Sequence, residues 1–81
     1  MVLRIELYGC LKDGGLGDFA EVEVSAGATS RQTLEALSAR LGKRAALAQA
    51  AVLATDFRIL RADETVPADA RLAALPPVCG G

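Results

Sequence analysis

Polar and apolar residues alternate over two short stretches near the start of the chain. In residues 2–8, three apolar side chains fall on one face: Leu3, Ile5 and Leu7. In residues 19–24, another three do the same: Ala20, Val22 and Val24. A period of two is typical of a half-buried β-strand. Because residues 13–18 between them are rich in glycine, we predict a hairpin with a long loop.

The next segment has the spacing of a helix. Thr29 or Ser30 is a suitable N-cap, and Gln32 stands three residues after Thr29, as in a capping box. Gly42 is suited to end the helix. Three leucines then recur at positions i, i+3 and i+7 on one face: Leu34, Leu37 and Leu41. We therefore predict one main helix between these two boundaries.

Shorter elements are predicted in the second half. Residues 43–51 are rich in alanine and could form a short second helix. Residues 52–54 favour a short buried strand, and residues 57–60 favour a short strand or an extended segment. Residues 71–75 are predicted as the last strand, which Pro76 and Pro77 end because proline offers the sheet no N–H donor. This order predicts an α+β fold with one helix packed on a mixed sheet. We expect a body at residues 1–75 and a tail at residues 76–81.

Length and charge limit the function. A chain of 81 residues makes one domain with a small core, which leaves no room for a deep substrate cavity. Nine basic residues against ten acidic residues give a net charge of −1. That balance argues against a nucleic-acid binder, which would carry a strongly basic surface. No long uncharged apolar run predicts a membrane span, and no signal peptide is evident, so we expect a cytoplasmic protein.

The composition also excludes several kinds of chemistry. There is no histidine, which removes imidazole-dependent triads and, with two cysteines, a closed zinc site of the usual type. Cys10 and Cys79 are too few for a disulfide framework. Cys10 is therefore interpreted as a small buried residue, and Cys79 as a small residue without a required redox role. We expect no metal and no permanently bound cofactor.

The distinctive chemistry lies in the last seven residues, Leu75-Pro76-Pro77-Val78-Cys79-Gly80-Gly81. The two prolines restrict their own backbone and extend the residue before them, so they favour a stiff arm. Val78 is a small apolar anchor, and two glycines without side chains could thread a narrow channel. Six extended residues reach up to roughly 20 Å, which is enough to enter another protein's active site.

The reactive group of such an arm would be the terminal carboxylate of Gly81. A carboxylate is a poor electrophile and must be activated, most simply as an acyl-adenylate made from ATP. Sulfide could then displace AMP and leave a thiocarboxylate, whose ionised sulfur is nucleophilic for the same reason that a thiolate is. A partner would supply positive charge, bases and the exclusion of water.

Length, element order and the tail "LPPVCGG" together resemble the ubiquitin-like sulfur carriers. This β-grasp group includes the small subunit of molybdopterin synthase and the sulfur carrier of the thiamine pathway. The resemblance is stronger to the molybdopterin synthase subunit, because the thiamine carrier usually lacks the paired prolines. It therefore implies a ubiquitin-like β-grasp fold with an extended C-terminal tail.

The resemblance also implies roles for particular residues. An adenylating enzyme related to ubiquitin activators would adenylate Gly81, and a sulfur-relay donor would convert it to a thiocarboxylate. The tail would then enter the large synthase subunit, with Gly80 lining the channel, and give sulfur to a cyclic pterin, so the chain has no catalysis of its own. The expected partner contacts are these tail residues, together with Tyr8 of the first strand: Leu75, Pro76, Pro77, Val78, Cys79 and Gly80.

The chain departs from the family pattern at three places. Ala74 and Leu75 stand where aromatic residues are common, Asp69 lies in a turn that often reads Asp-Gly-Asp, and Cys79 replaces a serine, threonine or alanine. Three alternatives remain open: a carrier for thiamine or another sulfur-insertion pathway, a modifier joined to lysines through Gly81, and an interaction module with an idle terminus.

Overall fold

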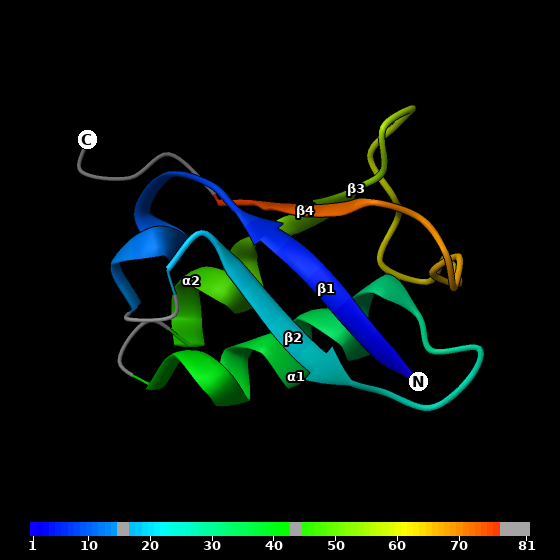
Figure 1. Cartoon of the computed structure of the whole chain (residues 1–81), viewed down its shortest axis with the longest axis horizontal. Helices are drawn as coiled ribbons and strands as arrows, with labels where there is room; N and C mark the ends of the chain where they lie inside the picture. The colour runs from blue at the N-terminus through cyan, green and yellow to red at the C-terminus, as the bar shows by residue number, and fades with distance from the viewer. Residues whose placement is uncertain (15–16, 43–44, 77–81) are drawn as a thin grey trace.

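The computed structural model describes residues 1–14, 17–42 and 45–76, which form a mixed four-stranded sheet covered on one face by helices (Figure 1). The strand order is β2-β1-β4-β3. The strands have these bounds: β1 Val2–Leu7, β2 Phe19–Glu23, β3 Val52–Ala54 and β4 Leu72–Leu75. The predicted α+β arrangement with a mixed sheet is confirmed.

The first and last strands are neighbours at the centre of the sheet. β1 pairs antiparallel with β2, where Ile5 lies opposite Ala20, and parallel with β4, where Ile5 lies opposite Leu72. β3 completes the sheet by pairing antiparallel with β4. The segment that leads to the tail is therefore held between β1 and β3 in the interior of the sheet, not on an edge.

The main helix, α1 (Ser30–Leu41), begins at the predicted capping box. The backbone N–H of Gln32 donates to the Thr29 hydroxyl at 3.2 Å, and the Thr29 N–H donates to Oε1 of Gln32 at 2.9 Å. A second helix, α2 (Ala45–Ala50), follows and packs against α1. Both helices lie on the same side of the sheet (Figure 1).

The core fills the space between the sheet and these helices. Alternation in β1 and β2 directs one face of each strand inward, as predicted, and the helix contributes its leucine stripe. Five large apolar side chains are completely or almost completely buried: Ile5, Leu7, Leu11, Leu37 and Leu53. No described buried side-chain nitrogen or oxygen lacks a hydrogen-bond partner.

The connection after β1 differs from the predicted open loop. Residues Gly9–Gly14 form a 3₁₀ helix, η1, and the strand ends at Leu7, one residue earlier than predicted. The cause is Leu11, which is fully buried and draws the chain back over the core, while its N–H donates to the Tyr8 carbonyl at 3.2 Å. Cys10 lies within η1 and is half-buried, so its interpretation as a buried residue was only partly right.

Two details after β3 differ from the predicted strands. Residues 57–60 form no regular strand, which leaves the alternative of an extended segment: a single bridge joins Ala54 to Ile59, and the Thr55 hydroxyl accepts bonds from the N–H groups of Phe57 and Arg58 in a turn. The last strand begins at Leu72 rather than at residue 71. Among the described residues, positive φ occurs only at glycines, so Asp69 forms its turn without the left-handed conformation.

Candidate functional site

The parallel pairing of β1 and β4 brings two predicted site residues to the same end of the sheet. Leu7 lies opposite Ala74, so the chain segments that follow them, beginning with Tyr8 and Leu75, leave the pairing side by side. On the other side of β4, Leu75 lies opposite Val52 of β3. Three strands thus contribute to the surface from which residue 76 departs.

The apolar side chains at this end form a small patch, which we call the tail-end patch: Tyr8, Val52, Ala73 and Leu75. Their neighbours Leu7, Leu53 and Ala74 are buried toward the helices, so alternation places the patch on the opposite, uncovered face. Tyr8 is 42% exposed and Val52 is 38% exposed. An open hollow runs beside the patch, lined by Glu6, Tyr8, Ala73, Leu75 and residues of the turn after β3.

Gly9 and Pro76 meet where the two strands end. Gly9 has φ +58°, and a Cβ atom at this position would lie 3.0 Å from Cγ of Pro76. The proline ring therefore packs on a backbone that lacks a side chain, in a conformation that glycine adopts without penalty. This contact fixes the place at which the chain enters the tail.

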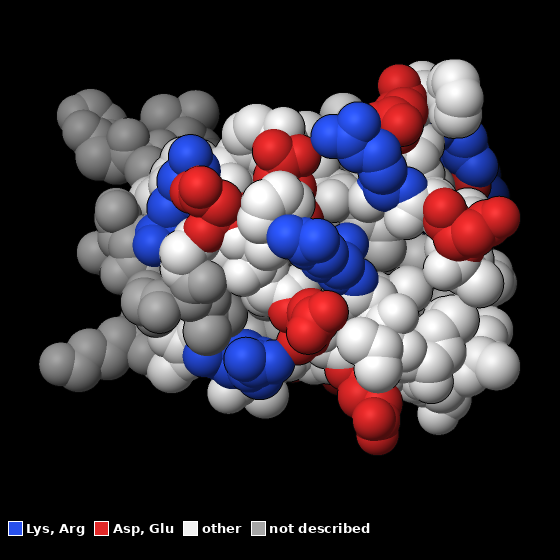
Figure 2. Space-filling view, in the orientation of Figure 1, with Lys and Arg blue, Asp and Glu red and all other residues white. Residues whose placement is uncertain are grey.

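Charged side chains surround the patch without dominating it. A hydrogen bond from the phenol to the Glu6 carboxylate, together with some burial and the Glu6 charge, raises the pKa of Tyr8. Nη2 of Arg71 lies 3.9 Å from Oε1 of Glu6. On the face shown in Figure 2, basic and acidic side chains are interspersed, and neither sign forms a continuous surface.

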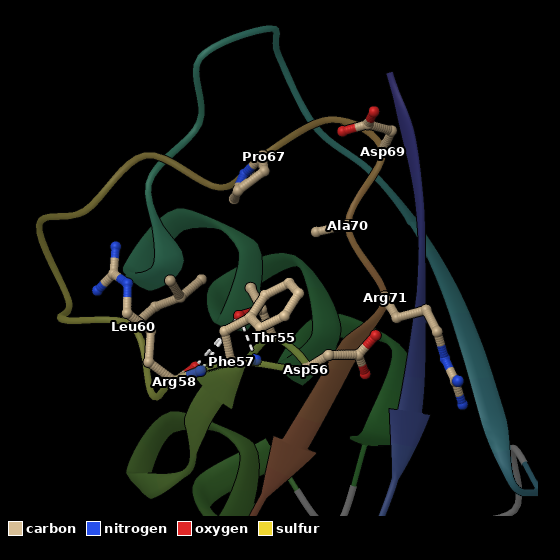
Figure 3. A pocket seen from close by; sticks show the side chains of 9 residues that line it. All are labelled: Thr55, Asp56, Phe57, Arg58, Leu60, Pro67, Asp69, Ala70 and Arg71. Carbon is tan, nitrogen blue, oxygen red and sulfur yellow. Dashed lines mark hydrogen bonds between the residues drawn. The ribbon is translucent and has the colours of Figure 1, made fainter.

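A second exposed apolar feature lies on the turn after β3. Phe57 is 93% exposed, the highest value among the large hydrophobic residues described. Ile59 is 59% exposed, as is Val2. Phe57 borders an open hollow that also includes Leu60 and Pro67 (Figure 3). This hollow shares Thr55, Asp56 and Arg71 with the hollow beside the tail-end patch. The two features therefore adjoin one another.

Of the predicted contact residues, the structure brings Tyr8, Leu75 and Pro76 together. The remaining predicted residues lie outside the described part of the chain: Pro77, Val78, Cys79, Gly80 and Gly81. Sequence reasoning missed Val52 and Gly9. A three-residue strand is too short for alternation to show which side chain faces outward, and a glycine beside a predicted loop gives no sign of the proline that packs on it.

Neither a metal centre nor a membrane span is found in the described residues. No group of three or more histidine, cysteine, aspartate or glutamate side chains there could hold a metal ion. Likewise, no helix within residues 1–14, 17–42 and 45–76 has the length and apolar character needed to cross a bilayer.

Comparison with known proteins supports the architecture. No family model and no curated protein matches the sequence. Among solved structures, SAMP1 from Haloferax volcanii is 21% identical, each chain is covered over 100% of its length, and the TM-score is 0.76. A second structure of this small archaeal modifier protein is 20% identical, with 95% of this chain and 98% of that chain covered and a TM-score of 0.75.

A third similar structure is a putative molybdopterin converting factor, subunit 1, from Pyrococcus furiosus. It is 19% identical, with 96% of this chain and 99% of that chain covered and a TM-score of 0.77. At such identities the likeness concerns the fold, and it extends over nearly the whole of each chain. The protein thus has the ubiquitin-like β-grasp fold that it shares with this modifier and this converting-factor subunit.

Proposed function

We propose that the protein is a sulfur carrier whose C-terminal Gly81 is adenylated and converted to a thiocarboxylate. The product would serve molybdopterin synthesis, with this chain as the small subunit of the synthase, working in the cytoplasm where ATP is available. The observation that carries the proposal is the pairing of β4 between β1 and β3. It directs residue 76 away from the sheet beside an exposed apolar patch.

Each part of this arrangement has a use in such a carrier. The rigid sheet positions the start of the tail, and the contact between Gly9 and Pro76 restricts its direction. The tail-end patch offers apolar area to a partner while the tail occupies that partner's active site. The chain itself supplies recognition and the carboxylate, and the partner enzymes supply the catalysis.

The charging reaction is balanced by ATP and a sulfur donor. A carboxylate oxygen of Gly81 attacks the α-phosphorus of ATP, and pyrophosphate leaves. The terminal sulfur of a relay protein's persulfide then attacks the acyl carbon and displaces AMP, which gives an acyl disulfide. A thiolate attacks the relay's cysteine sulfur in this intermediate, forms a disulfide with it and expels the thiocarboxylate, so thiols supply the two electrons. In the synthase, this sulfur would be transferred to a cyclic pterin bound to the large subunit.

The direct test combines the protein with an adenylating enzyme, ATP and a sulfur source in reducing buffer. Intact-mass analysis should show the replacement of one oxygen by one sulfur, and deletion of Gly81 should abolish it while the circular dichroism spectrum stays unchanged. An unmodified chain, in a reaction that charges a known carrier, would contradict the proposal. A sulfur-dependent product with the large synthase subunit would then establish the pathway.

The patch is tested by a charge placed at Val52. Val52→Lys should weaken binding to the adenylating enzyme or to the large subunit at least about tenfold, which is a loss of about 1.4 kcal/mol. Val2→Lys is the matched control, because Val2 is 59% exposed at the opposite end of β1. Equal affinities of the two variants, measured by calorimetry, would rule out the patch as a contact.

A second candidate is a protein modifier joined to lysines through Gly81. The similarity to the small archaeal modifier over the whole of both chains favours it as much as the converting-factor likeness favours the carrier. Expression of a tagged chain followed by mass spectrometry would distinguish them. Isopeptide-linked Gly81 on lysine side chains supports the modifier, and capture of a thiazole synthase in the same experiment would point to the thiamine pathway.

A further inference from the structure

The sheet of the described residues has two edges, β2 and β3, which differ in how they are covered. On β3, the Leu53 carbonyl accepts a hydrogen bond from the Leu60 N–H at 2.8 Å, and a bridge joins Ala54 to Ile59. The turn after β3 therefore covers that edge. β2 has only β1 beside it in the sheet, so its other side faces outward (Figure 1).

The register of β2 shows which of its backbone groups face outward. Leu7 donates its N–H to the Asp18 carbonyl at 2.8 Å, and Met1 and Val24 exchange hydrogen bonds of 2.9 Å in both directions. Because hydrogen-bonded and non-hydrogen-bonded pairs alternate along an antiparallel ladder, every second residue of β2 turns its N–H and C=O away from β1. These residues are Phe19, Glu21 and Glu23.

A contact with the main helix agrees with this assignment. The guanidinium of Arg40, in the last turn of α1, donates a hydrogen bond to the Glu21 carbonyl. The other outward groups of β2 have no hydrogen-bond partner among the described residues. A row of such groups is a template on which another extended chain can pair. An open hollow lies along this edge, lined by Arg4, Phe19, Ala20, Glu21 and Arg40.

The side chains along the edge select the charge of an added strand. Glu21 and Glu23 are exposed, and neither forms an ion pair with another described residue. Side chains of an added strand on this face would lie about 4.5–5.5 Å from them between Cβ atoms, where like charges are unfavourable. A second copy of β2 would bring the same carboxylates to the edge and is disfavoured. Cationic side chains at every second position are complementary.

We propose that the β2 edge binds an extended segment of a partner protein that carries lysine or arginine at alternate positions. The segment pairs with the outward N–H and C=O groups of β2 and adds a strand to the sheet. Its cations meet Glu21 and Glu23, and Arg40 leaves the Glu21 carbonyl as the strand arrives. Because β2 and β3 are opposite edges of the sheet, this contact and a partner at Val52 use different edges. The inference does not depend on the chemistry proposed for Gly81.

The first test uses a heptapeptide in which lysine and threonine alternate, and a matched peptide with glutamate in place of lysine. Amide NMR spectra of the full chain should show saturable shifts along β2, and the lysine peptide should bind at least about tenfold more tightly. The outward amides of Phe19, Glu21 and Glu23 should exchange with solvent more slowly in the complex, whereas those of Ala20 and Val22 should be protected throughout. No binding, equal affinities or unchanged exchange would overturn the proposal.

Glu21→Pro separates strand pairing from the attraction of charges. Proline removes an N–H that the sheet does not use and places its ring on the edge, so the lysine peptide should no longer bind while the fold persists. Glu21→Gln is the matched control, which keeps the N–H and should bind the peptide with reduced affinity. Equal binding by these two variants would mean that charge alone attracts the peptide, against the proposal.

A double variant gives the answer if the proline unfolds the chain. Glu21→Lys combined with Glu23→Lys should reverse the preference toward the glutamate peptide and keep the same pattern of slowed exchange. An unchanged preference for the lysine peptide would show that these carboxylates do not select the partner, and it would overturn the proposal.

The last test concerns Arg40 and the second copy. Arg40→Ala should bind the lysine peptide more tightly than Arg31→Ala, which removes one positive charge from the other end of α1. Equal affinities would contradict the displacement of Arg40. In sedimentation without peptide, the chain should remain a monomer as its concentration rises. A dimer that Glu21→Pro dissociates would assign the edge to a second copy and overturn the proposed partner.

Discussion

At the scale of the residue, Tyr8 reports on the surface beside the tail. It is the one tyrosine of the sequence, and there is no tryptophan, so its ionisation can be followed by absorbance without interference. It belongs to the tail-end patch, and its hydroxyl is engaged by Glu6. A change at this side chain therefore monitors the tail-end patch directly.

We expect Tyr8 to ionise above its ordinary pKa of 10.0, because the Glu6 carboxylate accepts a hydrogen bond from the neutral phenol and repels the phenolate. The interaction is present at neutral pH and is lost as the pH rises through the raised pKa. Glu6→Gln should lower the pKa of Tyr8. Glu23→Gln should leave it unchanged, because Glu23 is the last residue of β2 and pairs with Val2, at the end of β1 far from Tyr8. An absorbance titration with no difference between these variants would contradict the pairing.

Gly9 is the second informative residue. Gly9→Ala should destabilise the protein by more than the roughly 1–2 kcal/mol that a left-handed alanine costs, because the new Cβ would also press on Pro76. Gly27→Ala is the control: its φ is +82°, and nothing lies within 4 Å of the corresponding Cβ. Urea denaturation in reducing buffer measures the difference in the free energy of unfolding between Gly9→Ala and Gly27→Ala. The same comparison in a Pro76→Ala background should remove this difference, because the new Cβ then has no proline ring to press on. Equal losses at both glycines would show that the contact carries no energy.

At the scale of the element, α1 depends on its first turn. Thr29→Ala should cost about 1 kcal/mol, because the N–H of Gln32 loses its acceptor. Thr29→Ser keeps the hydroxyl and should remain near the wild-type stability. Denaturation midpoints of the two variants provide the measurement, and a Thr29→Ser variant as unstable as Thr29→Ala would argue that the methyl group matters rather than the cap.

The elements that sequence reasoning predicted correctly are those specified by neighbouring residues. The main helix was predicted from its leucine spacing and its capping box, and the first two strands from their alternation. Tyr8, Leu75 and Pro76 were identified through family resemblance, and the fold does place them together. Their common location depends on the pairing of β1 with β4, which no local pattern encodes.

The errors have long-range causes. The 3₁₀ helix after β1 forms because Leu11 finds a place in a core built by distant elements. Residues 57–60 have the residue types of a strand, yet the Thr55 hydroxyl closes a turn there, and one bridge at Ile59 is all the pairing that the segment makes. Propensity alone could not weigh these tertiary contacts.

At the scale of the whole molecule, the stability of the fold depends on one small hydrophobic core. Leu37 is fully buried, and Leu37→Ala should cost about 2–5 kcal/mol. A domain of this length has a total stability of only about 4–12 kcal/mol, so the loss should be conspicuous in a melting curve. Phe57→Ala, at a side chain 93% exposed, should change stability by less than about 0.5 kcal/mol. A comparable loss at Phe57 would mean that its turn packs against the body.

The central place of β4 has a consequence for folding. Residues 8–71 separate β1 from β4, yet the two strands must pair before either is flanked on both sides. Pairing between strands so far apart in the sequence gives a high contact order, which slows the assembly of the sheet. A chain truncated before Leu72 would lack the strand on which the sheet closes, so we expect it to form no ordered tail-end patch.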